Sequence, residues 1–112
     1  FDYRNFMIDE DRLSVSVDIV NTGAKTGDEV VQLYVKDIES SVIQPRKELR
    51  EFTRISLNPG EKKTVSFQLD EQDFMYWNQI SESWEVEPGD FEIQMGSSSV
   101  DIKFSQVINY IP

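Results

Sequence analysis

Apolar and polar residues alternate along much of this chain, and no long segment has the spacing of an amphipathic helix. Residues 13–19 read LSVSVDI, and residues 64–69 read TVSFQL. A period of two places successive side chains on opposite faces of a β-strand, so each segment has one buried and one solvated face. The pattern therefore predicts a protein built from strands.

Turn signals separate the alternating segments at regular intervals. They read NTG at 21–23, NPGE at 58–61 and EPGD at 87–90. Such sequences favour turns because Pro fixes φ and Gly accepts positive φ. We expect strands at 4–8, 13–19, 29–36, 49–57, 65–69, 91–95 and 102–104, with short apolar elements at 74–77 and 84–86. This number of short strands predicts an all-β, immunoglobulin-like sandwich of about seven strands, forming one domain over residues 1–112.

The segment GDEVVQLYVKD, residues 27–37, carries bulky side chains on both of its faces. We interpret it as a central strand that is covered on both sides, rather than as the wall of a binding site. In the segment at 49–57 the apolar spacing breaks strict alternation, which predicts a bulge near residues 50–52. Residues 70–73, which read DEQD, are expected to cap one short helical turn.

Composition excludes several classes of function. The net charge of −10 repels phosphate backbones and anionic lipids, so neither nucleic acid nor membrane is an expected partner. The chain has no Cys and no His, which excludes thiol chemistry and triads that use a His base. We expect no cofactor and no metal. The chain lacks an initiator Met and begins in a strand-like FDYRNFMI, which is typical of a piece of a longer protein.

Three blocks in order resemble the fibronectin type III-like domain of glycoside hydrolase family 3. They are NTG with GDEVVQLYVKD, then PRKELREFTRISLNPGEKKTVSFQL, then WEVEPGDFEIQMGSSS. The resemblance covers residues 1–104. That module lies at or near the C-terminus of many β-glucosidases and β-xylosidases. The chain departs from the family pattern at Gln44, where Arg is usual, and at Glu51, where Gly is usual, so an interdomain contact shaped by those residues would differ here.

The resemblance implies that the parent protein hydrolyses terminal β-linked sugars with retention, using two carboxyl groups about 5–5.5 Å apart. In that family both groups lie upstream of this module, and the S-D-W type segment that carries the nucleophile does not occur here. We therefore assign no catalytic residue. The chain is expected to be a non-catalytic accessory domain that packs on the catalytic domains of the same polypeptide and stabilises them. A secreted or periplasmic parent is favoured over a cytoplasmic one.

Aromatic residues are the main candidates for a contact with another domain or with a glycan. Tyr76, Trp77 and Trp84 carry large rings with a polar handle, which suits sugar stacking, core packing and docking alike. Trp84 is expected in the core. A patch that includes Trp77, Tyr110 and Ile111 is the predicted docking surface. A carbohydrate-binding module and a generic protein-interaction sandwich remain as alternative functions.

A basic cluster stands out in this acidic chain. It consists of Arg46, Lys47, Arg50 and Arg54. These cations could pair with acidic residues on the neighbouring domains, or they could form an ordinary solvated face.

Other polar groups resemble sites but have simpler interpretations. They are Asp70 with Asp73, Glu87 with Asp90, the DED turn at 9–11 and GSSS at 96–99. We interpret the two acid pairs as solvated turn residues, because a catalytic acid with a raised pKa needs an apolar pocket. The DED segment could ligate calcium, but it lacks EF-hand spacing and reads as a hairpin turn. The GSSS segment reads as a turn at a strand end.

Overall fold

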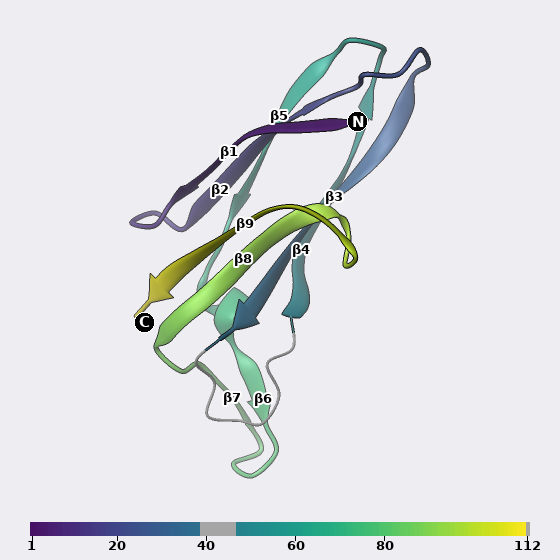
Figure 1. Ribbon diagram of the computed structural model, residues 1–112. Coiled ribbons are helices and arrows are strands. Elements are labelled where there is room, and N and C mark those ends of the chain that lie inside the picture. The colour runs from purple at the N-terminus through teal and green to yellow at the C-terminus, as the bar shows by residue number, and fades with distance from the viewer. Residues whose placement is uncertain (39–46, 112) are drawn as a thin grey trace.

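The computed structural model describes residues 1–38 and 47–111, which form nine β-strands and one short 3₁₀ helix (Figure 1). The elements are β1 (Asp2–Asp9), β2 (Ser14–Val20), β3 (Gly27–Asp37), β4 (Lys47–Leu57), β5 (Lys62–Gln68), η1 (Glu71–Phe74), β6 (Tyr76–Asn78), β7 (Ser83–Glu85), β8 (Gly89–Ser98) and β9 (Asp101–Tyr110). All the strand pairs are antiparallel. In these ranges no helix has the length and apolar character that a membrane crossing requires.

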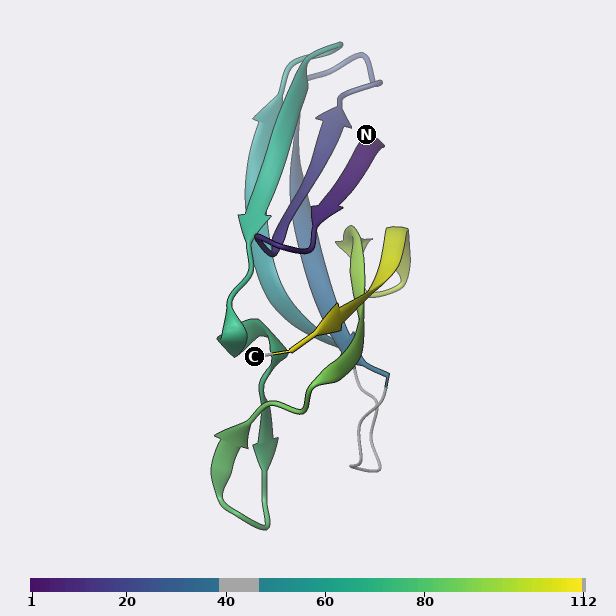
Figure 2. The same ribbon diagram turned by 90° about the vertical axis from the view of Figure 1, so that its left-hand side faces the viewer.

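Seven of the strands form two packed sheets. One sheet has the order β1-β2-β5 and the other has the order β4-β3-β8-β9. Figure 2 shows the sheets as two layers, with β6 and β7 as a separate hairpin beyond them. The predicted immunoglobulin-like, all-β sandwich is confirmed. The strand count is nine rather than about seven because the β6–β7 hairpin is added between β5 and β8.

The core fills the space between the two sheets. Its buried residues are Tyr3, Val15, Val17, Ile19, Val31, Leu33, Val35, Leu57, Val65, Phe67, Leu69, Phe74, Phe91, Ile93, Met95, Ile108 and Tyr110. The period-two segments supply their inward-facing residues, as in β2, where every second residue is fully buried. Each such Val, Ile or Leu contributes about 1.5–3 kcal/mol through burial. The alternation in the sequence is therefore what selects the interior.

Strand β3 is central, as the sequence predicts. It pairs with β4 on one side and with β8 on the other. Its inward residues Val31 and Leu33 are fully buried, and on its opposite face Tyr34 is also buried. The hydroxyl of Tyr34 donates to Oε1 of Gln32 at 2.5 Å, and Gln32 donates to the carbonyl oxygen of Ser97 at 3.2 Å. The bulk on both faces therefore serves the scaffold.

The predicted bulge in β4 is confirmed at Arg50. Leu33 pairs with Glu51 and Tyr34 pairs with Leu49, so Arg50 is an extra residue without a partner in β3. An inserted residue bends its strand and redirects the side chain. The Arg50 guanidinium reaches the end of η1, where Nη2 donates to the carbonyl oxygen of Met75 at 2.5 Å.

A buried Asn joins the β2–β3 connection to the β4–β5 turn. The Nδ2 atom of Asn21 donates to the carbonyl oxygen of Leu57 at 2.9 Å and to that of Lys25 at 2.8 Å. Its Oδ1 accepts from the backbone N–H of Gly23 at 2.9 Å. The carbonyl oxygen of Asn21 accepts from the N–H of Gly60 at 2.8 Å. The side chain of Asn21 thus joins the β2–β3 connection to the end of β4, and its backbone bonds to the NPGE turn; we call the three side-chain bonds the Asn21 clamp.

The chain end differs from the prediction. Strand β9 continues beyond the predicted 102–104 and pairs with β8 as far as Tyr110. Ile108 is buried, and Tyr110 is only 8% exposed. The Tyr110 ring stacks on Phe74, with 4.1 Å between ring centroids and an interplanar angle of 6°. Tyr110 therefore belongs to the core of this domain, and we remove it from the predicted docking patch.

Candidate docking surface

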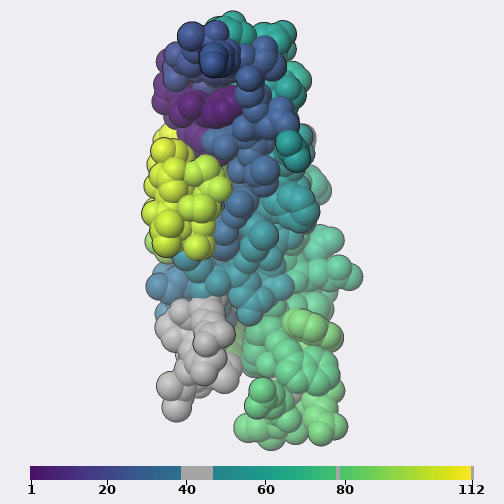
Figure 3. Space-filling view, turned by 90° about the vertical axis from the view of Figure 1, so that its right-hand side faces the viewer, coloured from purple at the N-terminus to yellow at the C-terminus, as the bar shows by residue number. Residues whose placement is uncertain are grey.

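The β6–β7 hairpin projects from one end of the sandwich (Figures 1 and 3). Within residues 1–38 and 47–111 its two strands pair only with each other, with Trp77 opposite Trp84. The sequence forms a hairpin because two short aromatic runs, YWN and SWE, flank the four residues 79–82, in which Glu82 adopts positive φ. A two-stranded hairpin is marginal by itself, so its cross-strand side chains matter.

The hairpin exposes its apolar residues. Trp77 is 47% exposed, Trp84 is 59% exposed, and Ile80 at the tip is 97% exposed. The expectation that Trp84 lies in the core is wrong. Trp84 alternates with Val86, which packs against the core, but Trp84 itself lies in a hairpin that is hydrogen-bonded to neither sheet of the sandwich. The sequence predicts which residues share a face and does not say what lies against that face.

The two indoles contact each other edge to face. Their ring centroids lie 5.6 Å apart, and the interplanar angle is 70°. Such pairs contribute about 0.5–1.5 kcal/mol beyond the area that they bury. The angle also means that Trp77 and Trp84 do not form the flat aromatic row that a glycan-binding platform would present.

The base of the hairpin is fixed to the sandwich. The hydroxyl of Tyr76 donates to Oε1 of Glu87 at 2.8 Å. Arg50 holds the carbonyl of Met75, just before β6, and its Nη2 lies 3.3 Å from Oε2 of Glu48. Tyr76 and Arg50, both predicted to contact another domain or a glycan, are therefore engaged within the domain and orient the hairpin.

The sequence around the hairpin is acidic throughout. Residues 70–92 hold eight of the 21 acidic residues of the chain and none of its 11 Lys and Arg residues. The acids are Asp70, Glu71, Asp73, Glu82, Glu85, Glu87, Asp90 and Glu92. Asp73 is buried, and the other seven acids are at least partly exposed, so this surface combines an exposed aromatic centre with surrounding negative charge.

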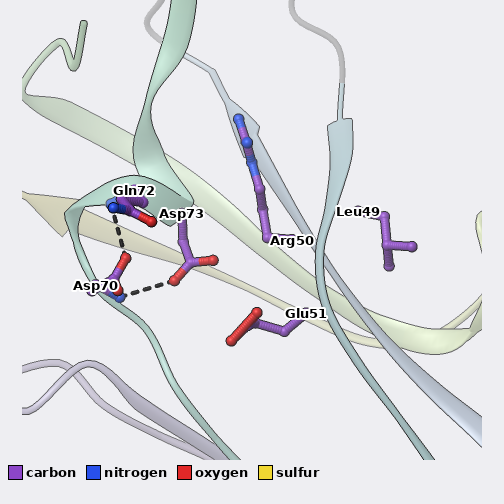
Figure 4. Close-up of a pocket in the computed structure, with 6 residues that line it drawn as sticks. All are labelled: Leu49, Arg50, Glu51, Asp70, Gln72 and Asp73. Atoms are coloured by element: carbon purple, nitrogen blue, oxygen red, sulfur yellow. Dashed lines mark hydrogen bonds between the residues drawn. The ribbon is translucent and has the colours of Figure 1, made fainter. Parts of the chain in front are cut away.

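A pocket of about 280 Å³ lies at the hairpin root. It is lined by Leu49, Arg50, Glu51, Asp70, Gln72 and Asp73. Figure 4 shows the Glu51 and Asp73 side chains on the same side of the pocket, with Arg50 extending away from them. Burial raises the pKa of the Asp73 carboxyl, and the nearby Asp70 carboxylate raises it further. Burial also raises the pKa of the Glu51 carboxyl. The negative charges of Asp73 and Asp70 raise this pKa further, by a smaller amount.

The carboxylates of Asp70 and Asp73 begin η1. Oδ1 of Asp70 accepts from the N–H of Gln72 at 2.9 Å, and Oδ2 of Asp73 accepts from the N–H of Asp70 at 2.9 Å. The predicted cap within residues 70–73 is confirmed, and Asp70 and Asp73 form a reciprocal capping box. The interpretation of Asp73 as a solvated turn residue is wrong, because the capping bond draws its side chain into the interior.

The second acid pair serves neighbouring strands. Glu87 accepts from Tyr76, as described above, and Oδ1 of Asp90 accepts from Nδ2 of Asn109 at 3.1 Å. Each carboxylate of the two acid pairs therefore has a structural partner within the domain.

The basic residues have separate partners within the domain. Nζ of Lys47 donates to Oε1 of Gln94 at 3.2 Å and lies 5.4 Å from the centroid of the Tyr34 ring. Nη2 of Arg54 pairs with Oδ2 of Asp28 at 2.6 Å. Arg46 lies outside the described residues. The cations that the structure describes are therefore directed to different neighbours.

The remaining polar motifs form turns. Oδ1 of Asp9 accepts from the N–H of Asp11 at 3.1 Å and from that of Arg12 at 3.3 Å, as in an Asx turn. Oγ of Ser98 accepts from the N–H of Asp101 at 3.1 Å and closes the β8–β9 turn. In residues 1–38 and 47–111, no group of three or more acidic side chains is placed to hold a metal ion.

Sequence reasoning missed one feature of the site and one feature of the fold elsewhere. The first is that the hairpin stands free of both sheets. Two aromatic runs separated by residues 79–82 are a hairpin signal, but nothing in them shows that the pair lacks a third strand. The second is the Asn21 clamp, since a buried Asn in an NTG segment looks like any other turn residue.

In comparisons with known proteins, most of this chain matches a small part of each of several larger proteins. Residues 29–99 match the family described as the fibronectin type III-like domain. The chain is 45% identical to thermostable beta-glucosidase B of Acetivibrio thermocellus over 96% of its length, which is 15% of that protein. It is 51% identical to a beta-xylosidase of Formosa agariphila over 77% of its length, which is 12% of that protein. The crystal structure of beta-glucosidase from Kluyveromyces marxianus superposes with a TM-score of 0.83 at 40% identity, over 96% of this chain and 13% of that one.

Proposed function

The chain belongs to the fibronectin type III-like domain family, and on that premise we propose that it is a non-catalytic accessory domain of a family 3 β-glycosidase. It packs on the catalytic domains of the same polypeptide and stabilises them. One observation carries the proposal: the alignment spans 96% of this chain but only 15% of a β-glucosidase. The domain comprises residues 1–112.

The chemistry of the parent follows from its relatives. Those relatives are named β-glucosidase and β-xylosidase, so the parent removes terminal β-linked sugars from glycosides. The two catalytic carboxyl groups belong to domains outside this chain. The structural partners of Asp70, Asp73, Glu87 and Asp90 support this assignment, because each carboxylate already serves a cap or a strand contact.

Stabilisation comes from burial of surface between domains. Interfaces within one chain cover about 600–1,500 Å², and their apolar part supplies the free energy. This domain has its own packed core, so it can present a preformed surface without ordering itself on contact. Any free energy gained at the interface then adds to the stability of both partners.

Deletion of the domain tests the proposal. The full-length polypeptide and a version lacking residues 1–112 are compared by thermal unfolding and by hydrolysis of an aryl β-glucoside. We expect the shortened protein to unfold at a lower temperature, and we expect addition of the separate domain to raise that temperature again. Equal unfolding temperatures and equal activity would overturn the proposal.

The exposed indoles favour one second candidate, a module that binds carbohydrate. Trp77 and Trp84 are the only two Trp residues of the chain, so their indole N–H signals are readily followed by NMR. Saturable shifts on titration with β-glucosides or cello-oligosaccharides would establish glycan binding. Because the rings lie at 70° to each other, we expect neither signal to move.

A further inference from the structure

We propose that the β6–β7 hairpin is the docking element of this domain, inserting Trp77, Ile80 and Trp84 into an apolar groove rimmed by Lys and Arg on another domain of the same polypeptide. The inference rests on the proposed function and specifies which surface performs it. It replaces the patch expected from the sequence, of which Trp77 remains.

The exposed apolar residues of the hairpin lie close together. Trp77 and Trp84 face each other across the two strands, and Ile80 lies in the turn that joins them. Aromatic residues that stand out of a surface in this way are typical of interface anchors, whereas scattered exposed apolar residues need no partner. The buried core of the sandwich does not include these three side chains, and their exposed surface is available for contact with another domain.

The hairpin is presented in a fixed orientation. Arg50 holds the carbonyl of Met75 at one end of β6, and the Tyr76–Glu87 hydrogen bond spans the base. The cross-strand indole contact links the two strands near the tip. An element that is already ordered loses little conformational entropy when it binds, so its apolar contacts contribute more of their free energy to docking.

Charge selects the kind of partner. Residues 70–92 carry eight acids and no Lys or Arg, and the Arg50 guanidinium at the hairpin base already pairs with Glu48, so the hairpin segment is negatively charged. A second copy would bring the same acidic segment against itself, and like charges across an interface oppose association. A neutral sugar has no charge to pair with these acids, and the two indoles at 70° do not offer it one flat face. A groove bordered by cations complements both the indoles and the carboxylates.

The length of the relatives indicates where such a partner lies. This chain covers 15% of the length of the Acetivibrio β-glucosidase and 13% of the Kluyveromyces structure. Most of a homologous polypeptide therefore lies beside this domain in the same molecule. A tethered partner is present at high effective concentration, so even a small hairpin surface suffices for docking.

Hydroxyl-radical footprinting tests the proposal in two samples, the full-length polypeptide and the separate 112-residue chain. We expect Trp77 and Trp84 to be oxidised several-fold more slowly in the full-length polypeptide. Met7, which is 67% exposed on β1, is the internal control and is expected to react equally in both samples. Equal oxidation of the indoles in the two samples would overturn the proposal.

A matched pair of variants identifies the contact. Ile80→Glu places a charge at the hairpin tip, and Val100→Glu places the same charge in the β8–β9 turn, at a residue that is 92% exposed. Neither variant is expected to change the stability of the separate chain. In the full-length polypeptide, Ile80→Glu is expected to restore rapid oxidation of both indoles, whereas Val100→Glu is expected to leave them protected. Continued protection in Ile80→Glu would contradict the assignment.

The outcomes separate this inference from the proposed function. If deletion of the domain destabilises the polypeptide while the indoles stay reactive, the accessory role stands and the hairpin assignment fails. If deletion has no effect, the accessory role itself fails. Protection of the separate chain that rises with its own concentration would indicate a second copy as the partner. Protection of the separate chain by cello-oligosaccharides would indicate a glycan. Either result would overturn the proposal.

Discussion

Replacement of Asn21 by Ala is expected to destabilise the domain more than its position in a connection would suggest. The variant leaves the carbonyls of Leu57 and Lys25 and the N–H of Gly23 without the Asn side chain. The Leu57 bond is buried, and the other two are partly buried. A buried group left unsatisfied costs about 1–3 kcal/mol and an ordinary bond about 0.5–1.5 kcal/mol, so we expect a loss of about 3 kcal/mol.

Urea unfolding followed by far-UV circular dichroism measures this loss. The midpoint is expected to fall while the slope stays the same, since the surface exposed on unfolding hardly changes. In a thermal scan, about 3 kcal/mol corresponds to a shift of roughly 10–20 °C for a domain near this size. Asn21→Asp keeps the acceptor but removes the donor and buries a charge, so it should be at least as damaging.

The matched control is Asn109→Ala. Asn109 is exposed, and its Nδ2 donates to Oδ1 of Asp90 at 3.1 Å. Surface substitutions of this kind usually change stability by less than about 0.5 kcal/mol. If Asn21→Ala proved no more destabilising than Asn109→Ala, the Asn21 side-chain hydrogen bonds would contribute nothing measurable to the free energy of unfolding. The argument from buried hydrogen bonds would then fail.

Two further predictions concern a close backbone approach and a buried acid. In Gly96→Ala the new Cβ would lie 2.1 Å from the carbonyl oxygen of Asp101, so we expect a loss of about 2–3 kcal/mol in urea unfolding. Gly60→Ala has positive φ but open space and should cost only about 1–2 kcal/mol; the reverse order would contradict this reasoning. Burial raises the folded-state pKa of Asp73, so its contribution to stability is complete below the ordinary carboxyl pKa and is lost as pH rises through the raised one. Across that window the free energy of unfolding should fall relative to Asp73→Asn, and parallel pH profiles would refute the assignment.

The sequence predicted those parts of the fold that depend on local pattern. The alternation in residues 13–19 identified β2 and its buried face, and bulk on both sides of residues 27–37 identified the central strand. A break in spacing located the bulge at Arg50. In each case the side-chain period determines which residues share a face, and burial in a sandwich follows from that period.

The rest depended on contacts between distant residues. Trp84 follows the period of a buried strand, yet no sheet lies against it. Tyr110 was expected to dock on a missing domain, yet pairing with β8 and stacking on Phe74 place it inside this one. Asp73 was expected to be solvated because acids surround it in the sequence, but capping geometry turns it inward. Local pattern does not specify which element covers a given face.

The edge-to-face indole pair also gives the hairpin an optical signature of its own. Two indoles held at close range and at a large angle couple their electronic transitions, which produces a paired band in circular dichroism. Because the chain has no other Trp, this band and the Trp fluorescence both report on the hairpin and not on the sandwich. Amide circular dichroism reports on the two sheets. A single sample therefore shows whether the projecting hairpin melts with the sandwich or before it, as a separate unit of lower stability.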